Sequence, residues 1–203
     1  MTIFNLQTSL KKFFFSVCLC LSIQIGYVIS AEDTKADQNT ASNLNVAEFD
    51  DDGLLIKPNN LDQWIHVGSN MGQGYNEALF DPASPGTFQI VEIEPSAYDY
   101  FKQHGRYANG TMIALSFYKA SDKSSPRLNG FHQGELVSFE IHLIDSQNFK
   151  EGRAFYNFGM KTVAEKIADG SRCVECHKTE GAFESTFTQF YPKMQNLLSI
   201  HKK

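Results

Sequence analysis

The motif C-V-E-C-H at residues 173–177 constrains this 203-residue chain more than any other feature. Two thiols separated by two residues can each bond one vinyl group of a haem, and the adjacent imidazole then lies below the iron as its axial ligand. The sequence therefore predicts one covalent haem c, attached to Cys173 and Cys176, with His177 as the metal ligand. The other two cysteines, Cys18 and Cys20, lie in an apolar N-terminal segment.

Two other interpretations of the motif stay open. A structural zinc site could use the same two cysteines and histidine, but it needs a fourth ligand that the motif does not supply. A thioredoxin-like redox pair would need a βαβ context, which the surrounding sequence lacks. Haem attachment is favoured because Cys173 and Cys176 are the cysteines that remain after export of the chain.

The N-terminal segment has the pattern of a secretory signal. Lys11 and Lys12 precede an apolar run over residues 13–29, and the sequence turns polar after Ala31. This order predicts a signal peptide over residues 1–30 and a periplasmic protein. A retained transmembrane anchor is the alternative, although the apolar run is short for crossing a bilayer.

Removal of the signal makes the protein more acidic. The formal net charge of the whole chain is −5, and it becomes −7 when Lys11 and Lys12 leave with a segment that has no acidic residue. An acidic domain argues against nucleic acid or an anionic membrane surface as partner. Residues 31–45 are small and polar, which predicts a disordered tether before a globular domain over residues 46–203.

The periodicity of the globular part predicts an α+β fold, mainly an antiparallel β-sheet with flanking helices. In residues 134–144, Phe139, Ile141 and Leu143 alternate with Ser138, Glu140 and His142, as in a half-buried strand. The other predicted elements are a capped turn at 59–65 that places Trp64 inward, strands at 88–93, 111–118 and 154–158, a loop at 121–129, and helices from Pro95 to Phe101 with an end at Gly105, at 161–169 and after Pro192.

An electron-transfer cytochrome would need a second axial ligand from the protein. Met194 is the methionine that follows the motif, and its spacing from Leu197 and Leu198 suits an apolar helix face better than ligation. Other candidates on chemistry alone are Met71, Met112, Met160, His66, His104, His132, His142 and His201. We therefore expect a vacant sixth position, with an electron carrier as an alternative.

The order of several short motifs resembles the cytochrome P-460 and cytochrome c′-beta family. The segments that carry the resemblance are 47–49, 53–55, 64–68, 91–95, Gly105, 109–111, the haem motif and 187–192. The resemblance covers nearly the whole mature domain. It implies a largely β-sheet, dimeric periplasmic haem protein with a five-coordinate iron and an open distal pocket. Four-helix-bundle cytochromes c′ also have a late haem motif, but the alternating strands argue against that fold.

The resemblance also predicts which chemistry is absent. Family members that oxidise hydroxylamine carry a lysine bonded to the haem edge, and Leu115 stands at the matching position here. Lys119 is the nearest substitute, but four strand residues place it about 13 Å away. The lysine cross-link is therefore predicted to be absent.

Further distal residues follow from the same resemblance. Gln89 stands where the family has an arginine, and Glu184 retains a carboxylate seven residues after the haem histidine. Glu184 is the predicted catalytic residue, because a carboxylate there could accept a proton; a solvated loop acid is the alternative. Phe88 and Phe117 would cap the iron with apolar surface, unless they are ordinary core residues.

The predicted function is therefore the binding of nitric oxide or carbon monoxide at a crowded, mainly apolar haem site, for scavenging or storage of nitric oxide. An apolar site favours uncharged ligands, because anions would lose their hydration. One alternative is a P-460-type oxidoreductase that acts on hydroxylamine or nitric oxide, with Glu184 as proton relay. A second is an electron-transfer cytochrome c with a small redox partner protein. The resemblance implies a homodimer.

Overall fold

The structure is a computed structural model that describes Leu44 and residues 46–74, 85–121 and 130–202. The predicted signal peptide and most of the predicted tether and of the predicted loop at 121–129 lie outside these residues. No helix in the described part of the chain has the length and apolar character needed to cross a membrane.

The described residues contain seven strands, three α-helices and two 3₁₀ helices. In chain order they are β1 (Leu55–Ile56), η1 (Leu61–Gln63), β2 (Ile65–Met71), β3 (Thr87–Ile93), α1 (Pro95–His104), β4 (Thr111–Ser121), β5 (His132–Ile144), β6 (Arg153–Asn157), β7 (Val163–Ala164), α2 (Arg172–Glu180), η3 (Thr188–Phe190) and α3 (Pro192–His201).

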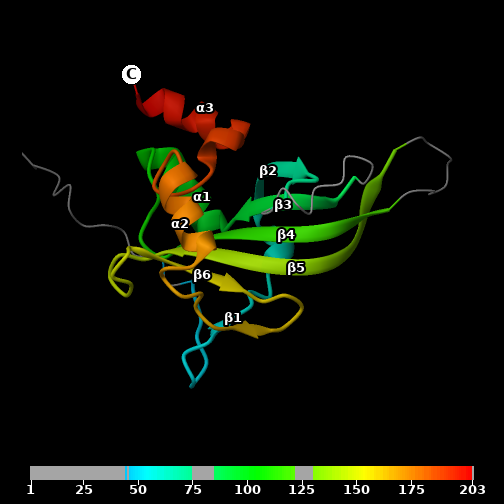
Figure 1. Cartoon of the computed structure of the whole chain (residues 1–203). Coiled ribbons are helices and arrows are strands. Elements are labelled where there is room, and N and C mark those ends of the chain that lie inside the picture. Colours follow the sequence, from blue (N-terminus) through cyan, green and yellow to red (C-terminus); the bar gives the residue numbers. More distant parts are fainter. Residues whose placement is uncertain (1–43, 45, 75–84, 122–129, 203) are drawn as a thin grey trace, which may run out of the picture. The chain divides into compact units, whose positions relative to one another are not determined.

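Strands β2 to β6 form one antiparallel sheet in the order of the sequence, so each strand pairs with the next one along the chain (Figure 1). Antiparallel strands that follow one another can be joined by short connections, which makes this arrangement accessible from local pairing. The predicted α+β class with a mainly antiparallel sheet is confirmed. The strands expected at 88–93, 111–118, 134–144 and 154–158 correspond to β3, β4, β5 and β6.

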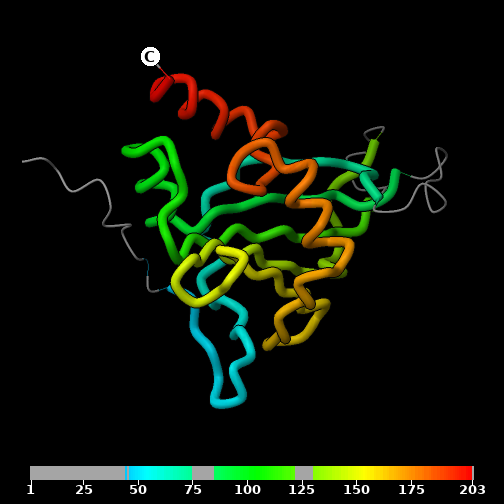
Figure 2. Tube along the Cα trace, turned by 60° about the vertical axis from the view of Figure 1, so that its left-hand side comes forward, coloured from blue at the N-terminus to red at the C-terminus, as the bar shows by residue number. Residues whose placement is uncertain are grey.

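The two faces of this sheet have separate cores. One face carries alternate residues of the central strands, such as Met112, Phe139 and Ile141, which pack with Trp64 beneath the small β1–β7 sheet. The other face packs against residues of α1 and α3 and includes Val91 and Ile113. Since neighbouring strand residues point to opposite faces, both cores follow from the alternation read in the sequence. In Figure 2 the orange segment, which contains α2, lies beside the strands of the sheet.

Helix α1 begins and ends where the sequence indicates. Glu94 caps its N-terminus by accepting the backbone N–H of Ala97 at 2.9 Å, and Pro95 occupies the first helical position, where no N–H is needed. Gly105 ends the helix in the left-handed conformation at φ 65°, which glycine adopts without a Cβ clash. The short helix predicted after Pro192 is α3, and Trp64 is buried as expected.

The helix predicted at residues 161–169 is wrong. This segment contains β7, which pairs antiparallel with β1, and Lys166 forms a further bridge with Tyr156. Ala164 packs in the core beneath the sheet, whereas Ile167 lines a cavity, so the apolar residues do not share one helical face. Strand pairing with β1 outweighs the weak helical preference of this short segment. The helix of this region is instead α2, which contains the C-V-E-C-H motif.

The start of the described chain is tied to the sheet. The backbone N–H of Leu44, which lies in the predicted tether, donates to the carbonyl oxygen of Asn109 at 2.8 Å. Asn109 also accepts the backbone N–H of Ser146 through its side chain at 2.6 Å. The turn that opens β4 therefore joins three segments far apart in the sequence.

Candidate functional site

Helix α2 presents the three motif side chains on one face. Cys173, Cys176 and His177 occupy positions i, i+3 and i+4, which lie on the same side of a helix, and all three line one cavity. Val174, on another side, is buried in the core. Ser171 caps the helix by accepting the backbone N–H of Val174 at 3.4 Å.

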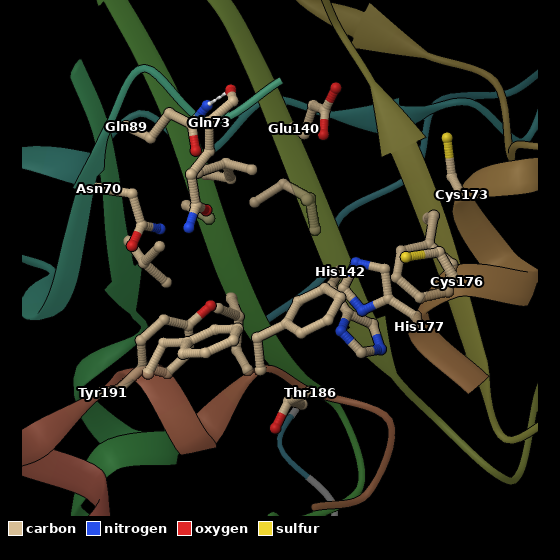
Figure 3. A pocket seen from close by; sticks show the side chains of 18 of the residues that line it. Asn70, Gln73, Gln89, Glu140, His142, Cys173, Cys176, His177, Thr186 and Tyr191 are labelled. Carbon is tan, nitrogen blue, oxygen red and sulfur yellow. Dashed lines mark hydrogen bonds between the residues drawn. The ribbon is translucent and has the colours of Figure 1, made fainter. Parts of the chain in front are cut away.

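The cavity lies between α2 and the face of the sheet that also carries the core of α1 and α3. Its volume is about 660 Å³, within the range of small-molecule and cofactor sites. Strand residues of odd number in β3 and β4, among them Val91, Ile113 and Leu115, give it an apolar wall. Three amide side chains from β2, β3 and the residues after β2 lie at the end away from the motif (Figure 3): Asn70, Gln73 and Gln89.

His177 is held in one orientation by the residues around it. Its Nδ1 lies 2.9 Å from the carbonyl oxygen of Ser185, and since a carbonyl can only accept, Nδ1 carries the proton and donates it. The Nε2 atom is then left as the basic nitrogen, which is the one available to bind a metal. Burial lowers the pKa of His177, which favours the neutral imidazole.

Three rings surround this imidazole. The ring of Phe155 lies 4.5 Å from that of His177, and the ring of Phe187 lies 4.6 Å from it. His142 of β5 meets it edge-on at 5.2 Å and is stacked on Phe155 at 4.2 Å. His177 is therefore fixed by packing as well as by its hydrogen bond, as expected for an axial ligand whose surroundings set its direction.

His142 is a polar group that the sequence pattern did not place. It is buried, and its Nε2 has no hydrogen-bond partner among the described residues. Burial, with a contribution from His177, lowers its pKa well below the usual value. Its ring lies edge-on against that of His177, with no space between the two rings for a planar group, so His142 suits the role of a neighbour of the predicted axial ligand.

Glu140 is a second lining residue that sequence reasoning missed. It lies on β5 directly opposite Leu115 of β4, so it faces the same cavity. Its Oε1 accepts the side-chain amide of Asn157 at 2.9 Å. The signal that could have found it is strand register, since cross-strand neighbours share a face. The expected alternation of β5 is correct, but its polar side faces the cavity at Glu140 and His142.

The predicted distal residues divide into two groups. Leu115 and Gln89 line the cavity, and the side-chain amide of the buried Gln89 donates to the backbone oxygen of Gln73. Phe88 and Phe117 are not among the described residues that line it. Phe88 follows the opposite parity of β3 from Gln89, and Phe117 lies beyond Leu115 toward the far end of β4.

The structure places Glu184 outside the lining of the cavity. Its Oε2 accepts the backbone N–H of Tyr107 at 3.2 Å, across 77 positions of sequence. The residue as a whole is exposed, but its carboxylate lies against this N–H, and partial burial raises its pKa. The carboxylate therefore lies in the turn that follows α2, at residues 181–185, and not in the described cavity wall.

Most alternative iron ligands lie elsewhere. Met194 is buried in the core of α1 and α3, as its spacing predicted, and Met112 is buried in the core on the opposite face. Of the other candidates, Met71 and His142 line the cavity, and Met71 is 45 % exposed. Within residues 46–74, 85–121 and 130–202, no three side chains of His, Cys, Asp or Glu gather as a metal-binding group.

The residues present fit a haem. The two thiols and His177, whose Nε2 is left as the basic nitrogen, line one cavity with apolar walls, and His142, whose buried Nε2 has no hydrogen-bond partner among the described residues, lines it too. Cys173 and Cys176 are both free thiols, one exposed and the other partly buried, so they are available to form thioether bonds.

The sequence of this chain matches a known protein family over the region that contains the site. Residues 58–188, more than half of the chain, match the model of one family, described as Cytochrome P460. The matched region runs from just before η1 to the start of η3 and so contains the five-stranded sheet, the motif helix and the turn that follows it. No curated protein matches the sequence.

Proposed function

Because the chain belongs to the cytochrome P460 family, whose members are haem proteins, we propose that it is a c-type member that binds nitric oxide or carbon monoxide. One haem would be attached to Cys173 and Cys176, with His177 as the protein ligand to iron. The observation that carries the proposal is the apolar wall around Leu115.

That wall offers no amine for a cross-link to the haem edge. Leu115 lies opposite Val91 in the β3–β4 register, and no lysine is among the described residues that line the cavity. Lys119, the nearest lysine on β4, pairs with Glu135 at 2.9 Å, and its side chain is 61 % exposed. A leucine side chain has no nucleophilic atom, which supports ligand binding over hydroxylamine oxidation.

The polarity of the cavity supports an uncharged ligand. Apolar side chains of β3 and β4 form the wall around Leu115, and the far end offers amide groups, which are neutral donors and acceptors. The charged side chains in the described lining are Glu140 of β5 and Arg172 of α2. An anion entering such a site would lose hydration without a cationic partner at that end. When bound, the haem supplies the iron to which a diatomic molecule attaches, while these side chains limit its size and charge.

One observation favours a second function, an oxidoreductase that acts on hydroxylamine or nitric oxide. Glu140 places a carboxylate in the cavity wall opposite Leu115, where it could accept a proton from a nitrogen substrate. Under this alternative, Glu140 replaces Glu184 as the acid–base residue, because Glu184 is turned toward Tyr107.

The cellular setting forms part of the same proposal. The N-terminal pattern of two lysines and an apolar run supports export to the periplasm, where the protein would scavenge or store nitric oxide. We also propose a homodimer, as the resemblance to the family implies, and a small redox protein that would reduce the iron. Fractionation of cells that express the full chain, followed by light scattering of the purified protein, tests localisation and oligomeric state.

Ligand binding and turnover, measured on the same haem-loaded protein, test the function. We expect the reduced protein to bind one carbon monoxide or nitric oxide per chain and to consume no hydroxylamine in the presence of an electron acceptor. Sustained hydroxylamine turnover that Glu140→Gln abolishes and Glu184→Gln spares would establish the oxidoreductase instead. Failure to bind either gas, with a low-spin ferrous spectrum, would indicate an electron carrier.

A further inference from the structure

We propose that Glu184 is a positioning residue for the iron ligand: it holds residues 181–185, the proximal turn, so that the carbonyl of Ser185 accepts the Nδ1–H of His177. The inference rests on the proposed haem site, because it concerns the histidine that would bind the iron. It assigns Glu184 a place behind that histidine, in contrast to a catalytic role in the cavity.

The backbone of the proximal turn is strained at the two residues that matter. Glu184 and Ser185 have φ values of 47° and 56°, in the left-handed region. They are the non-glycine residues with positive φ in the described part of the chain. Side chains with a Cβ enter this region at a cost and stay there when surrounding contacts hold them. Two such residues in succession, ending at the carbonyl that faces His177, indicate that the orientation of this carbonyl is maintained by other contacts.

Two of those contacts are made by Glu184 itself. Its carboxylate accepts the backbone N–H of Tyr107 at 3.2 Å, and its carbonyl oxygen accepts Nη1 of Arg153 at 3.3 Å. A side-chain bond on one side and a main-chain bond on the other fix the peptide that precedes Ser185. The rotation of the Ser185 carbonyl is therefore restricted from the residue before it, in addition to the hydrogen bond that the N–H of the same peptide, that of Thr186, donates to the carbonyl oxygen of Phe183 at 2.9 Å.

The anchor at Tyr107 is rigid. Tyr107 is 5 % exposed, its ring packs 4.7 Å from Phe101, and its hydroxyl pairs with that of Thr188 at 2.9 Å. Phe183, in the proximal turn, lies 5.9 Å from both the Phe101 and Tyr107 rings. The N–H that donates to Glu184 thus belongs to a residue in the core of α1 and α3. Through this hydrogen bond the carboxylate fixes the proximal turn relative to that core.

The other end of the turn packs directly against the motif helix. A Cβ on Gly181 would lie 2.5 Å from the carbonyl oxygen of His177 and 2.6 Å from the carbonyl carbon of Ser185. Only a residue without a side chain allows the turn to approach α2 this closely. Gly181 and Glu184 therefore act together: one permits the approach, and the other fixes its direction.

The consequence concerns the donor strength of the histidine. A hydrogen bond from Nδ1–H to a well-placed acceptor raises the basicity of the nitrogen that binds the metal and fixes the plane of the ring. A more basic ligand stabilises the oxidised iron and lowers its reduction potential. Loss of the Glu184 contact should let the Ser185 carbonyl turn away, weaken this hydrogen bond and raise the potential.

The test compares Glu184→Ala, Glu184→Gln and Glu180→Ala in full-length haem-loaded protein. The readouts are the reduction potential and the iron–histidine stretching band of the ferrous form in resonance Raman spectra. We expect Glu184→Ala to raise the potential and lower the stretching frequency. Glu184→Gln, which keeps an acceptor oxygen, should restore values close to wild type. Glu180→Ala removes an exposed acid at the C-terminal end of α2 and should change neither the potential nor the stretching frequency.

Three outcomes decide the proposal. If the wild-type protein shows no iron–histidine band, the proposed haem site itself is wrong, whatever the role of the proximal turn. A band that is present in wild type but unmoved in Glu184→Ala would overturn the positioning role. Equal shifts in Glu184→Gln and Glu184→Ala would overturn the hydrogen-bond account and indicate an effect of charge. If Glu184→Ala does not fold, Glu184→Asp takes its place: its shorter side chain withdraws the acceptor from the N–H of Tyr107 while keeping the charge, and the same direction of shift is expected.

Discussion

The two walls of the cavity are built in different ways. The wall that holds the motif comes from one continuous segment, from the cap at Ser171 to Phe187. The opposite wall combines residues of β2, β3 and β4, such as Asn70, Gln89 and Leu115, which are brought together by strand register. The first wall should give all-or-none effects when it is changed, because in the proposed function it holds the haem. The second should give graded effects, because it shapes the space that a ligand enters.

The largest effect is expected from the double variant Cys173→Ala, Cys176→Ala. Loss of both thiols removes the groups that attach to the haem, so covalent haem should disappear. Mass spectrometry after acid–acetone extraction measures this directly. Glu175→Ala, between the two cysteines but directed outward toward Lys178, is the matched control and should retain full haem content. Haem that stays bound to the double variant after extraction would break the assignment of the motif.

The next effect concerns the ligand on the same wall. His177→Gly should keep covalent haem through the cysteines but lose the protein ligand to iron, with a changed absorption spectrum. Added imidazole should restore the spectrum, because the ring cage of His142, Phe155 and Phe187 leaves a space of the right shape. His132→Gly, at the exposed start of β5, should need no rescue. An unchanged spectrum in His177→Gly would mean that another residue binds the iron.

The difference between the walls also explains what could be predicted from the sequence. The motif, the strand alternation, the start of α1 at Pro95 and its end at Gly105 depend on residues close together in the chain, and each was predicted. The opposite wall depends on pairings between strands, where a shift of one residue exchanges the two faces. Gln89 lines the cavity and its neighbour Phe88 does not, although both were predicted to line it.

Two other residues were outside the reach of local patterns. Glu140 could have been found from its pairing with Leu115, but the β4–β5 register contains irregularities near Phe117 and Tyr118 that no sequence motif indicates. Glu184 was predicted from a family position, which gives the residue but not the direction of its side chain. The segment 161–169 was mistaken for a helix because its strand partner, β1, lies more than 100 positions earlier.

Leu115→Ala sharpens the comparison at the opposite wall. Removal of the side chain should enlarge the cavity near the apolar wall and speed carbon monoxide binding to the ferrous protein several-fold, at a stability cost of about 2 kcal/mol or less for a partly buried leucine. Flash photolysis measures the on-rate. Tyr118→Ala, on the other face of β4 by strand alternation and outside the described lining, should leave the on-rate unchanged. Equal on-rates in Leu115→Ala and wild type would show that Leu115 does not face the ligand.

The smallest effect is expected at the amide end of the cavity. Gln89→Leu removes a side chain that bonds the backbone of Gln73, and a hydrogen bond contributes roughly 1 kcal/mol, or about fivefold in an equilibrium constant. The dissociation rate of nitric oxide from the ferrous protein should rise by no more than this factor. Gln133→Leu, on the exposed part of β5, is the control. A much larger effect would give the amide end a direct part in holding the ligand.

The absorption spectrum of the purified ferrous haem-loaded protein tests the central claim most directly. With Leu115 in the cavity wall and His177 as the protein ligand, the spectrum should be that of a high-spin, five-coordinate c-type haem that shifts on addition of carbon monoxide. Sharp low-spin bands that carbon monoxide does not change would indicate a second protein ligand and an electron carrier. A red-shifted ferrous band would indicate a side-chain cross-link to the haem edge, and the account of the Leu115 wall would then be contradicted.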